Sequence, residues 1–227
     1  MFYNNFNGRL WPRADRHVAP DFSVKETISM KNVLCFGDSN TWGSVPGVLT
    51  RHPKDVRWTG VVQNILGPEY NIIDDGIPGR TTAYDDPANQ CRNGLSAIGY
   101  TLYRAKPLDL AVVMLGTNDK HYTDINGFYD GLSMLSRRIL NANKLFPGTS
   151  DVFPGEPKLL LVAPIYAVPE ETPYVEPVSR LAGELGMPWL NAAQFAVPDP
   201  ADGCHMNAEN HHSLGVALAA KIKEILG

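Results

Sequence analysis

Cysteine is scarce in this chain of 227 residues. The three cysteines, Cys35, Cys91 and Cys204, are scattered and form no CxxC pair. An odd number at such spacing fits neither a disulfide framework nor a zinc site. Cys35 stands inside an apolar run, so we expect a small buried side chain there. Cysteine usage of this kind favours a reducing, cytoplasmic location.

The chain also lacks a block of basic residues and any long apolar run. Its formal net charge is −4, whereas binding to nucleic-acid phosphates needs clustered Lys and Arg. No stretch is apolar over the roughly 18 residues that a membrane-spanning helix requires. We therefore expect neither nucleic acid nor a membrane as a partner. Two catalytic motifs are missing as well, the GxSxG of α/β-hydrolases and the GxxxxGK[ST] of P-loop proteins.

The first thirty residues differ from the rest of the chain. They mix aromatic side chains with Arg, His, Asp and Asn, show no sustained period, and lack the continuous apolar core of a secretory signal. Met30 reads like a natural start directly before the first apolar run. We expect an N-terminal extension over residues 1–30, either flexible or packed as an arm on another subunit, followed by one domain over residues 31–227.

Short apolar runs alternate with helical patterns from Lys31 onward. The runs are rich in Val, Ile and Leu, which suits strands buried on both faces of a parallel sheet. They cover residues 33–36, 70–73, 108–115, 159–163 and 189–191. Between them, apolar side chains recur three or four positions apart, as in helices that pack on a sheet. The helical stripes are Leu95, Ile98 and Leu102; Phe128, Leu132, Leu135 and Ile139; Val175, Val178, Leu181 and Leu185; and Leu214, Leu218, Ile222 and Ile225. The alternation predicts a doubly wound α/β domain with right-handed crossovers.

Polar clusters follow the first three predicted strands, where the working residues of such folds gather. Ser39, in Gly37-Asp38-Ser39, can present its Oγ as a nucleophile at the edge of the sheet. Gly79, after the second strand, can bring its backbone N–H close to a developing oxyanion. Asn118, after the third strand, can donate a hydrogen bond from its side-chain amide. Taken singly, each residue can equally serve a turn or a helix cap.

A fourth polar cluster, containing Asp202 and His205, precedes the last predicted helix. An Asp and a His three residues apart can hydrogen-bond, which holds the other imidazole nitrogen outward as a general base. A surface Asp–His pair is the plain alternative. Cys204 is disfavoured as a nucleophile because neighbours in sequence generally point apart. His211 and His212 lack the i, i+4 spacing of a helical metal pair, so no metal is expected.

Taken in order, the four clusters resemble the four blocks of the SGNH (GDSL) hydrolase superfamily, and the resemblance extends from about Lys31 to the C-terminus. Cys204 departs from the pattern, since the family commonly has an aliphatic residue there. Further segments resemble the arylesterase/acyltransferase subgroup: Arg57-Trp58-Thr59-Gly60, Asp86-Pro87, Arg92-Asn93-Gly94, Leu108-Asp109-Leu110 and Met114-Leu115-Gly116-Thr117-Asn118-Asp119.

The resemblance implies a flavodoxin-like three-layer sandwich with a five-stranded parallel sheet. It implies a catalytic triad of Ser39, His205 and Asp202. The oxyanion hole would combine the backbone N–H groups of Ser39 and Gly79 with the Asn118 side chain, although some relatives carry another small residue in place of Gly79. No metal or organic cofactor is implied. Relatives in the subgroup include higher oligomers, so a homo-oligomer is expected.

Such a site would make the protein a serine esterase that hydrolyses small carboxylic esters with aryl or alkyl alcohols and short acyl groups. The acyl-enzyme would pass to water or to another alcohol, depending on how dry and apolar the alcohol site is. A carbohydrate acetylesterase and a lipase-like hydrolase are the alternatives within the superfamily. A non-catalytic binding protein of this fold is a third, against which the four intact blocks count. The residues expected to build the substrate pocket are Asn40, Trp42, Ile165, Tyr166, Val168, Phe195 and Met206.

Overall fold

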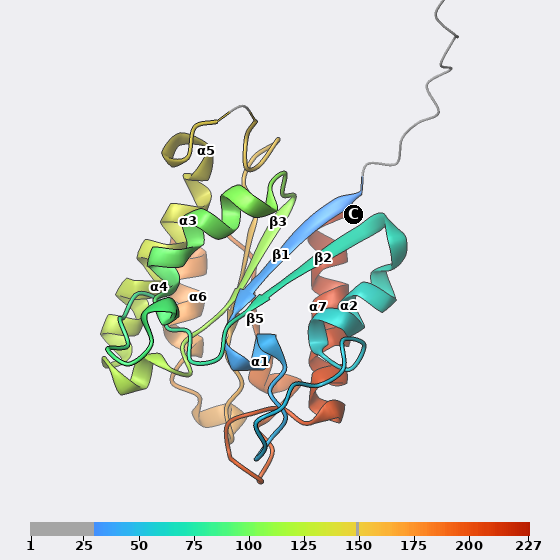
Figure 1. Ribbon diagram of the computed structural model, residues 1–227, viewed down its shortest axis with the longest axis vertical. Coiled ribbons are helices and arrows are strands. Elements are labelled where there is room, and N and C mark those ends of the chain that lie inside the picture. The colour runs from blue at the N-terminus through green and yellow to red at the C-terminus, as the bar shows by residue number, and fades with distance from the viewer. Residues whose placement is uncertain (1–29, 149) are drawn as a thin grey trace, which may run out of the picture.

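A parallel sheet forms the centre of the protein. The computed structural model describes residues 30–148 and 150–227, so the extension expected over residues 1–30 lies, apart from Met30, outside the described residues. Five strands run in the order β2-β1-β3-β4-β5, every neighbouring pair parallel (Figure 1). They are β1 (Lys31–Gly37), β2 (Tyr70–Gly76), β3 (Leu110–Met114), β4 (Leu159–Ala163) and β5 (Trp189–Asn191). This is the strand order of flavodoxin-like folds, and it confirms the expected architecture.

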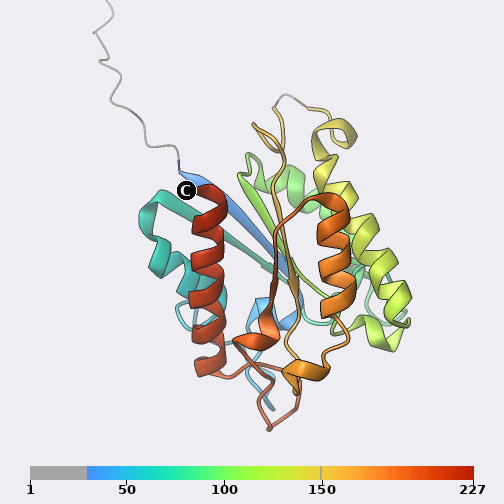
Figure 2. The same ribbon diagram turned by 180° about the vertical axis from the view of Figure 1, so that it is seen from behind.

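Helices cover both faces of the sheet (Figures 1 and 2). One face carries α3 (Gly94–Ala105), α4 (Ile125–Leu140) and α6 (Val175–Leu185). The other carries α2 (Trp58–Leu66) and α7 (Ala208–Leu226). Four of these helices confirm the apolar stripes, whereas α2 was not predicted. Within the described residues, no helix combines the length and the apolar character needed to cross a bilayer.

Shorter elements join the strands and helices. They are α1 (Ser39–Trp42), α5 (Ala142–Leu145) and single 3₁₀ turns at Gly67–Glu69, Gln90–Arg92, Asp119–His121, Pro169–Glu171 and Ala192–Gln194.

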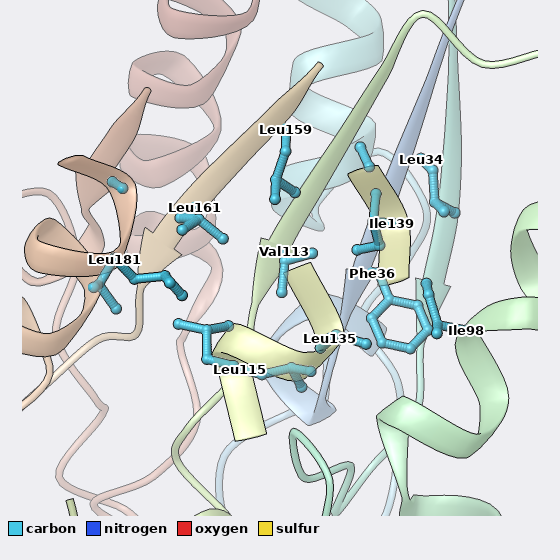
Figure 3. Packing of buried hydrophobic residues seen from close by; sticks show 14 of the residues in the cluster. Leu34, Phe36, Ile98, Val113, Leu115, Leu135, Ile139, Leu159, Leu161 and Leu181 are labelled. Atoms are coloured by element: carbon cyan, nitrogen blue, oxygen red, sulfur yellow. The ribbon is translucent and has the colours of Figure 1, made fainter. Parts of the chain in front are cut away.

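Alternate residues of β1 enter two separate apolar layers, because successive side chains of a strand point to opposite faces. Leu34 and Phe36 join Val113 under α3, α4 and α6 (Figure 3). Val33 and Cys35 face α2 and α7 in the second layer. All four β1 side chains are buried, as expected for a strand covered on both faces, and the prediction of a buried Cys35 is confirmed.

The third strand is shorter than the predicted run 108–115, although Leu108 and Leu115 are both buried. The chain leaves the sheet at Gly116, whose φ is +134°. A Cβ at this position would lie 2.7 Å from the ring of Phe128. Only glycine therefore allows the backbone to approach α4 so closely. This turn directs the following loop, with Asn118, along the carboxyl edge of the sheet.

Candidate active site

Ser39 stands at the turn between β1 and α1, at the carboxyl edge of the sheet. β1 ends at Gly37, where a Cβ would lie 2.0 Å from Thr41 Oγ1. Asp38 then caps α1, its Oδ1 accepting a hydrogen bond from the N–H of Asn40 at 2.9 Å. This tight turn makes Ser39 the first helical residue directly after the strand, with 5 % of its surface exposed.

A chain of hydrogen bonds links Ser39 to His205 and Asp202. His205 Nε2 lies 3.0 Å from Ser39 Oγ, and His205 Nδ1 lies 2.8 Å from Asp202 Oδ2. When Nδ1 carries the proton that Asp202 accepts, Nε2 has a lone pair for the Ser39 hydroxyl proton. The three residues expected to form a triad are therefore brought together in the geometry of nucleophile, base and orienting acid.

Backbone groups around Asp202 keep its carboxylate in place. The N–H groups of Cys204 and His205 donate to Oδ1, and the N–H of Gly47 donates to Oδ2, each at 2.9 Å. Burial raises the pKa of Asp202, but the hydrogen bonds from His205, Gly47 and Cys204 outweigh it and hold the pKa well below its ordinary value. Asp202 is thus an anion at neutral pH.

Asn40 fixes the segment around His205 from both sides. Its Nδ2 donates to the carbonyl oxygen of Cys204 at 3.1 Å, and its Oδ1 accepts the N–H of Met206 at 3.1 Å. The side chain is 2 % exposed and does not line the cavity beside Ser39. Asn40 is therefore not a substrate-pocket residue, contrary to the expectation from the sequence. Its amide pairs with one carbonyl and one N–H that flank the imidazole, and so it ties the His205 segment to α1.

Gly79 and Asn118 line the same cavity as Ser39. Gly79 has a φ of +80°, and a Cβ there would lie 2.5 Å from Arg92 Nε, so the guanidinium group packs directly on the glycine backbone. In the described parts of the chain, the backbone N–H groups of Ser39 and Gly79 have no backbone acceptor. Asn118 Nδ2 donates to the carbonyl oxygen of Arg80 at 3.1 Å, which fixes the orientation of the amide. The three expected oxyanion donors are thus placed around one cavity.

Two buried carboxyl groups lie next to these donors. Asn118 Nδ2 approaches Asp38 Oδ2 at 3.5 Å, and Asp119 accepts hydrogen bonds from the backbone N–H and the hydroxyl of Thr82. Burial raises the pKa of Asp38 to about 6 and that of Asp119 to about 6. A raised pKa means that the folded protein binds these protons more tightly than the unfolded chain does. The free energy of unfolding therefore falls as the pH rises from 3.8 to about 6.

A cavity of about 650 Å³ opens beside Ser39. Part of its lining is apolar and comes from the segment after α1. Another part is polar, and there Arg92 forms an ion pair with Asp86. Besides the triad and the oxyanion donors, the lining residues are Trp42, Ser44, Val45, Gly47, Val48, Leu49, Thr50, Pro78, Arg92, His121, Tyr122 and Cys204. Only Trp42 among them was expected from the sequence to line the pocket.

Ile165 and Met206, expected in the pocket, belong to the core instead. They are 4 % and 0 % exposed and pack in the apolar layer that faces α2 and α7. Met206 directly follows His205, and its side chain enters the core while the imidazole faces Ser39. The expectation for both residues is therefore corrected.

Three further pocket candidates lie outside the cavity lining. Tyr166 packs against the other apolar layer, with its ring centroid 6.2 Å from that of Tyr174. Val168 and Phe195 are 42 % and 40 % exposed and do not line the cavity. The loops that carry these residues leave β4 and β5, which lie at the far side of the sheet from β1 and β2.

His211 is buried and contacts Trp58 and His52 rather than the cavity beside Ser39. Its Nδ1 accepts the N–H of Trp58 at 3.3 Å, and its ring packs edge-on against His52 with centroids 5.1 Å apart. Burial lowers the pKa of His211 to about 3, so the ring is neutral. Within residues 30–148 and 150–227, no group of three or more His, Cys, Asp or Glu side chains has the arrangement of a metal site.

Comparison with known families assigns this geometry to a class. The GDSL-like lipase/acylhydrolase family matches residues 35–212, and the chain belongs to that family. The match covers the segments that carry Ser39, Gly79, Asn118, Asp202 and His205. A comparison with curated proteins found no match.

Solved structures place the chain among SGNH hydrolases. An aryl esterase from M. smegmatis is 33% identical, with a TM-score of 0.79 over 86% of this chain and 100% of that chain. A carbohydrate acetylesterase from Sinorhizobium meliloti is 32% identical, with a TM-score of 0.77 over 86% of this chain and 99% of that chain. A lipase/acylhydrolase from Enterococcus faecalis, 20% identical with a TM-score of 0.63 over 87% of this chain and 98% of that chain, shares the fold. These structures confirm the resemblance to the superfamily, and the protein is a hydrolase of the esterase type.

Proposed function

We propose that the protein hydrolyses small carboxylic esters, with short acyl groups and aryl or alkyl alcohols, through a covalent acyl-enzyme on Ser39. The observation that carries the proposal is the hydrogen-bonded series Ser39–His205–Asp202 beside a cavity of about 650 Å³. A cavity of this size accepts a small ester. The aryl esterase from M. smegmatis supports the same substrate class.

Acylation begins when His205 Nε2 takes the hydroxyl proton of Ser39 and Oγ attacks the ester carbonyl. Asp202 stabilises the imidazolium that forms. In the proposed mechanism, the N–H groups of Ser39 and Gly79 donate to the tetrahedral oxyanion. The Asn118 amide also donates to the oxyanion, which replaces Asp38 Oδ2, its partner at 3.5 Å. His205 then returns the proton to the alcohol oxygen, and the alcohol leaves.

Deacylation repeats these steps with a different nucleophile. His205 removes a proton from water as the water oxygen attacks the acyl carbon. The bond to Ser39 Oγ then breaks, His205 returns the proton to Oγ, and the acid is released. A second alcohol in the same position yields a new ester instead. We propose that acyl transfer of this kind accompanies hydrolysis, because much of the cavity wall is apolar and favours an alcohol over water.

Turnover of p-nitrophenyl acetate by the purified protein tests the proposal. Replacing Ser39 by alanine should lower kcat by about 10⁴–10⁶. A matched control is Ser96→Ala, which removes the hydroxyl of an exposed serine on α3 and should leave kcat unchanged. A wild-type rate no higher than that of Ser39→Ala would contradict the proposal and favour a binding protein without catalysis.

A carbohydrate acetylesterase is the second candidate. The neighbour from Sinorhizobium meliloti supports it, and so does the polar part of the cavity, because the guanidinium group of Arg92 lines it and can donate hydrogen bonds to hydroxyl groups. A panel of aryl acetates, longer acyl esters and acetylated sugars separates the candidates by kcat/KM. A clear preference for acetylated sugars would replace the first proposal.

Self-association and a cytoplasmic location stay predictions. Light scattering of chains that start at Met1 and at Met30 measures the oligomeric state and the contribution of residues 1–29 to it.

A further inference from the structure

The cavity wall formed by residues 44–50, here called the strap, carries apolar side chains outside both core layers. The strap folds back on itself, with the N–H of Val45 donating to the carbonyl oxygen of Thr50 at 3.0 Å. Val48 is half-exposed and Leu49 fully exposed, yet both line the cavity. Exposed aliphatic side chains at the tip of a loop contribute nothing to the core, and a loop beside a catalytic site commonly contacts substrate.

Arg51 fixes the end of the strap to the body of the protein. Its Nε donates to the carbonyl oxygen of Trp42 at 2.6 Å, and its Nη2 pairs with Asp74 Oδ2 at 2.9 Å. The guanidinium carbon also lies 5.0 Å from the centroid of the Trp42 ring, which lines the cavity. The strap and this ring are therefore held in a defined position before any substrate binds, which lowers the cost of binding.

The strap lies on the side of the site where His205 stands. The N–H of Gly47 donates to Asp202 Oδ2, the same oxygen that faces His205 Nδ1. Gly47 has a φ of +70°, and a Cβ there would lie 3.7 Å from the Cβ of Ala201. In both views of the ribbon, the loop after α1 and the loop before α7 run side by side at the carboxyl edge of the sheet (Figures 1 and 2).

The chemistry of ester cleavage decides which part of a substrate faces this side. The carbonyl oxygen must point to the donors on Ser39, Gly79 and Asn118. The alcohol oxygen must lie within hydrogen-bond reach of His205 Nε2, because that nitrogen returns the proton on which departure of the alcohol depends. The carbon chain of the alcohol therefore extends from the neighbourhood of His205, on the side where Gly47 of the strap contacts Asp202.

We infer that the strap is the alcohol-binding wall of the site, with Val45, Val48 and Leu49 in contact with the carbon chain of the alcohol. This inference rests on the proposed esterase function and deepens it. The same residues bind the leaving alcohol in acylation and the accepting alcohol in acyl transfer. Burial of each additional methylene against them raises kcat/KM about fourfold until the chain reaches solvent. Alcohol preference and the share of acyl transfer are thus set by one segment, and the acyl group binds elsewhere.

Two nearly isosteric polar substitutions, Val48→Thr and Leu49→Asn, test the inference. We expect them to lower kcat/KM for butyl acetate about tenfold more than for methyl acetate. The ratio of kcat/KM for methyl acetate to kcat/KM for methyl butyrate, which differ only in the acyl group, should change by less than about twofold. With 1-butanol present, the ratio of butyl ester to free acid should fall in both variants. The control is Leu145→Asn, which changes an exposed leucine on α5 at the other end of the sheet. It should change neither the alcohol preference, nor the acyl preference, nor the ratio of butyl ester to free acid.

The outcomes separate the inference from the function on which it rests. A wild-type protein that cleaves none of these esters overturns both. An active wild type whose strap variants keep the alcohol ranking, or change the acyl ranking instead, overturns the strap assignment and leaves the esterase function standing.

Discussion

Replacing Asn40 by alanine removes the two hydrogen bonds that hold the segment around His205. The carbonyl oxygen of Cys204 and the N–H of Met206 each lose a partner at 3.1 Å, and the N–H is buried. A buried group left without its partner costs about 1–3 kcal/mol, so the variant should lose about 2–4 kcal/mol of unfolding free energy. A domain of ordinary stability, about 5–15 kcal/mol, remains folded after such a loss.

The larger effect of Asn40→Ala is expected on the chemical step. Once the segment is released, His205 Nε2 no longer stays 3.0 Å from Ser39 Oγ. A misplacement on the order of 1 Å can cost about 10²-fold in rate, so kcat should fall about 10- to 100-fold. KM should change little, because Asn40 does not line the cavity. Steady-state kinetics with p-nitrophenyl acetate and urea unfolding measure the two effects separately.

Asn143 provides a matched control, since it bridges backbone groups in the same way far from the site. Its Nδ2 donates to the carbonyl oxygen of Phe153 at 2.7 Å, and its Oδ1 accepts the N–H groups of Val152 and Phe153. Asn143→Ala should lose comparable stability and keep its kcat. If Asn40→Ala keeps kcat within about twofold of wild type, or if both variants lose kcat alike, the assignment of Asn40 as a positioning residue is refuted.

Three other predictions concern the surroundings of Ser39. Asn118→Ala should lower kcat by about 10²–10³ with little change in KM, and a near-wild-type rate would remove the amide from the oxyanion hole. Asp38→Asn removes a carboxyl group whose pKa is raised by burial to about 6. The unfolding free energy measured with urea should then fall less steeply between pH 4 and 6, because about one proton fewer is released on unfolding. An unchanged slope contradicts that account. Arg80→Lys cannot reproduce the contacts of the buried guanidinium with the carbonyl oxygen of Gly37 and with Asp75, and we expect a loss of about 2–4 kcal/mol that leaves KM unchanged.

The meeting of the motif residues was predictable because parallel strands place their carboxyl ends at one edge, whereas the flavodoxin-like sheet was implied by the resemblance to the superfamily. The helix α2 was not predicted, although its apolar residues Trp58, Val61, Val62 and Leu66 recur at helical spacing. Its sequence includes Gly60 and the β-branched Val61 and Val62, which are poor helix formers. Gly60 is required by packing, since a Cβ there would lie 1.8 Å from the carbonyl oxygen of Lys54. Tertiary contact with α7 stabilises this helix more than its propensity does.

The substrate pocket was the least predictable part. Apolar residues beside a motif can turn either to the cavity or to the core, and backbone direction decides between them. Met206 enters the core directly after His205, and Asn40 turns to the backbone of the His205 segment directly after Ser39. Leu49 lies in a short loop that contains Pro46 and Gly47, which are typical of turns, so no periodic pattern marked it as a wall of the cavity. Such positions depend on where distant segments meet, which one sequence does not record.

Separation along the chain has a consequence for the timing of synthesis. Ser39 and His205, the proposed nucleophile and base, are 166 residues apart. A ribosome adds about 5–20 residues per second, so the nucleophile emerges about 10–30 s before the imidazole that activates it. Throughout that interval the nascent chain carries a serine without a proton acceptor. With the proposed roles, a fragment that ends before Asp202 lacks both the base and its orienting carboxylate, and it should cleave esters far more slowly than the full chain however well its sheet has formed.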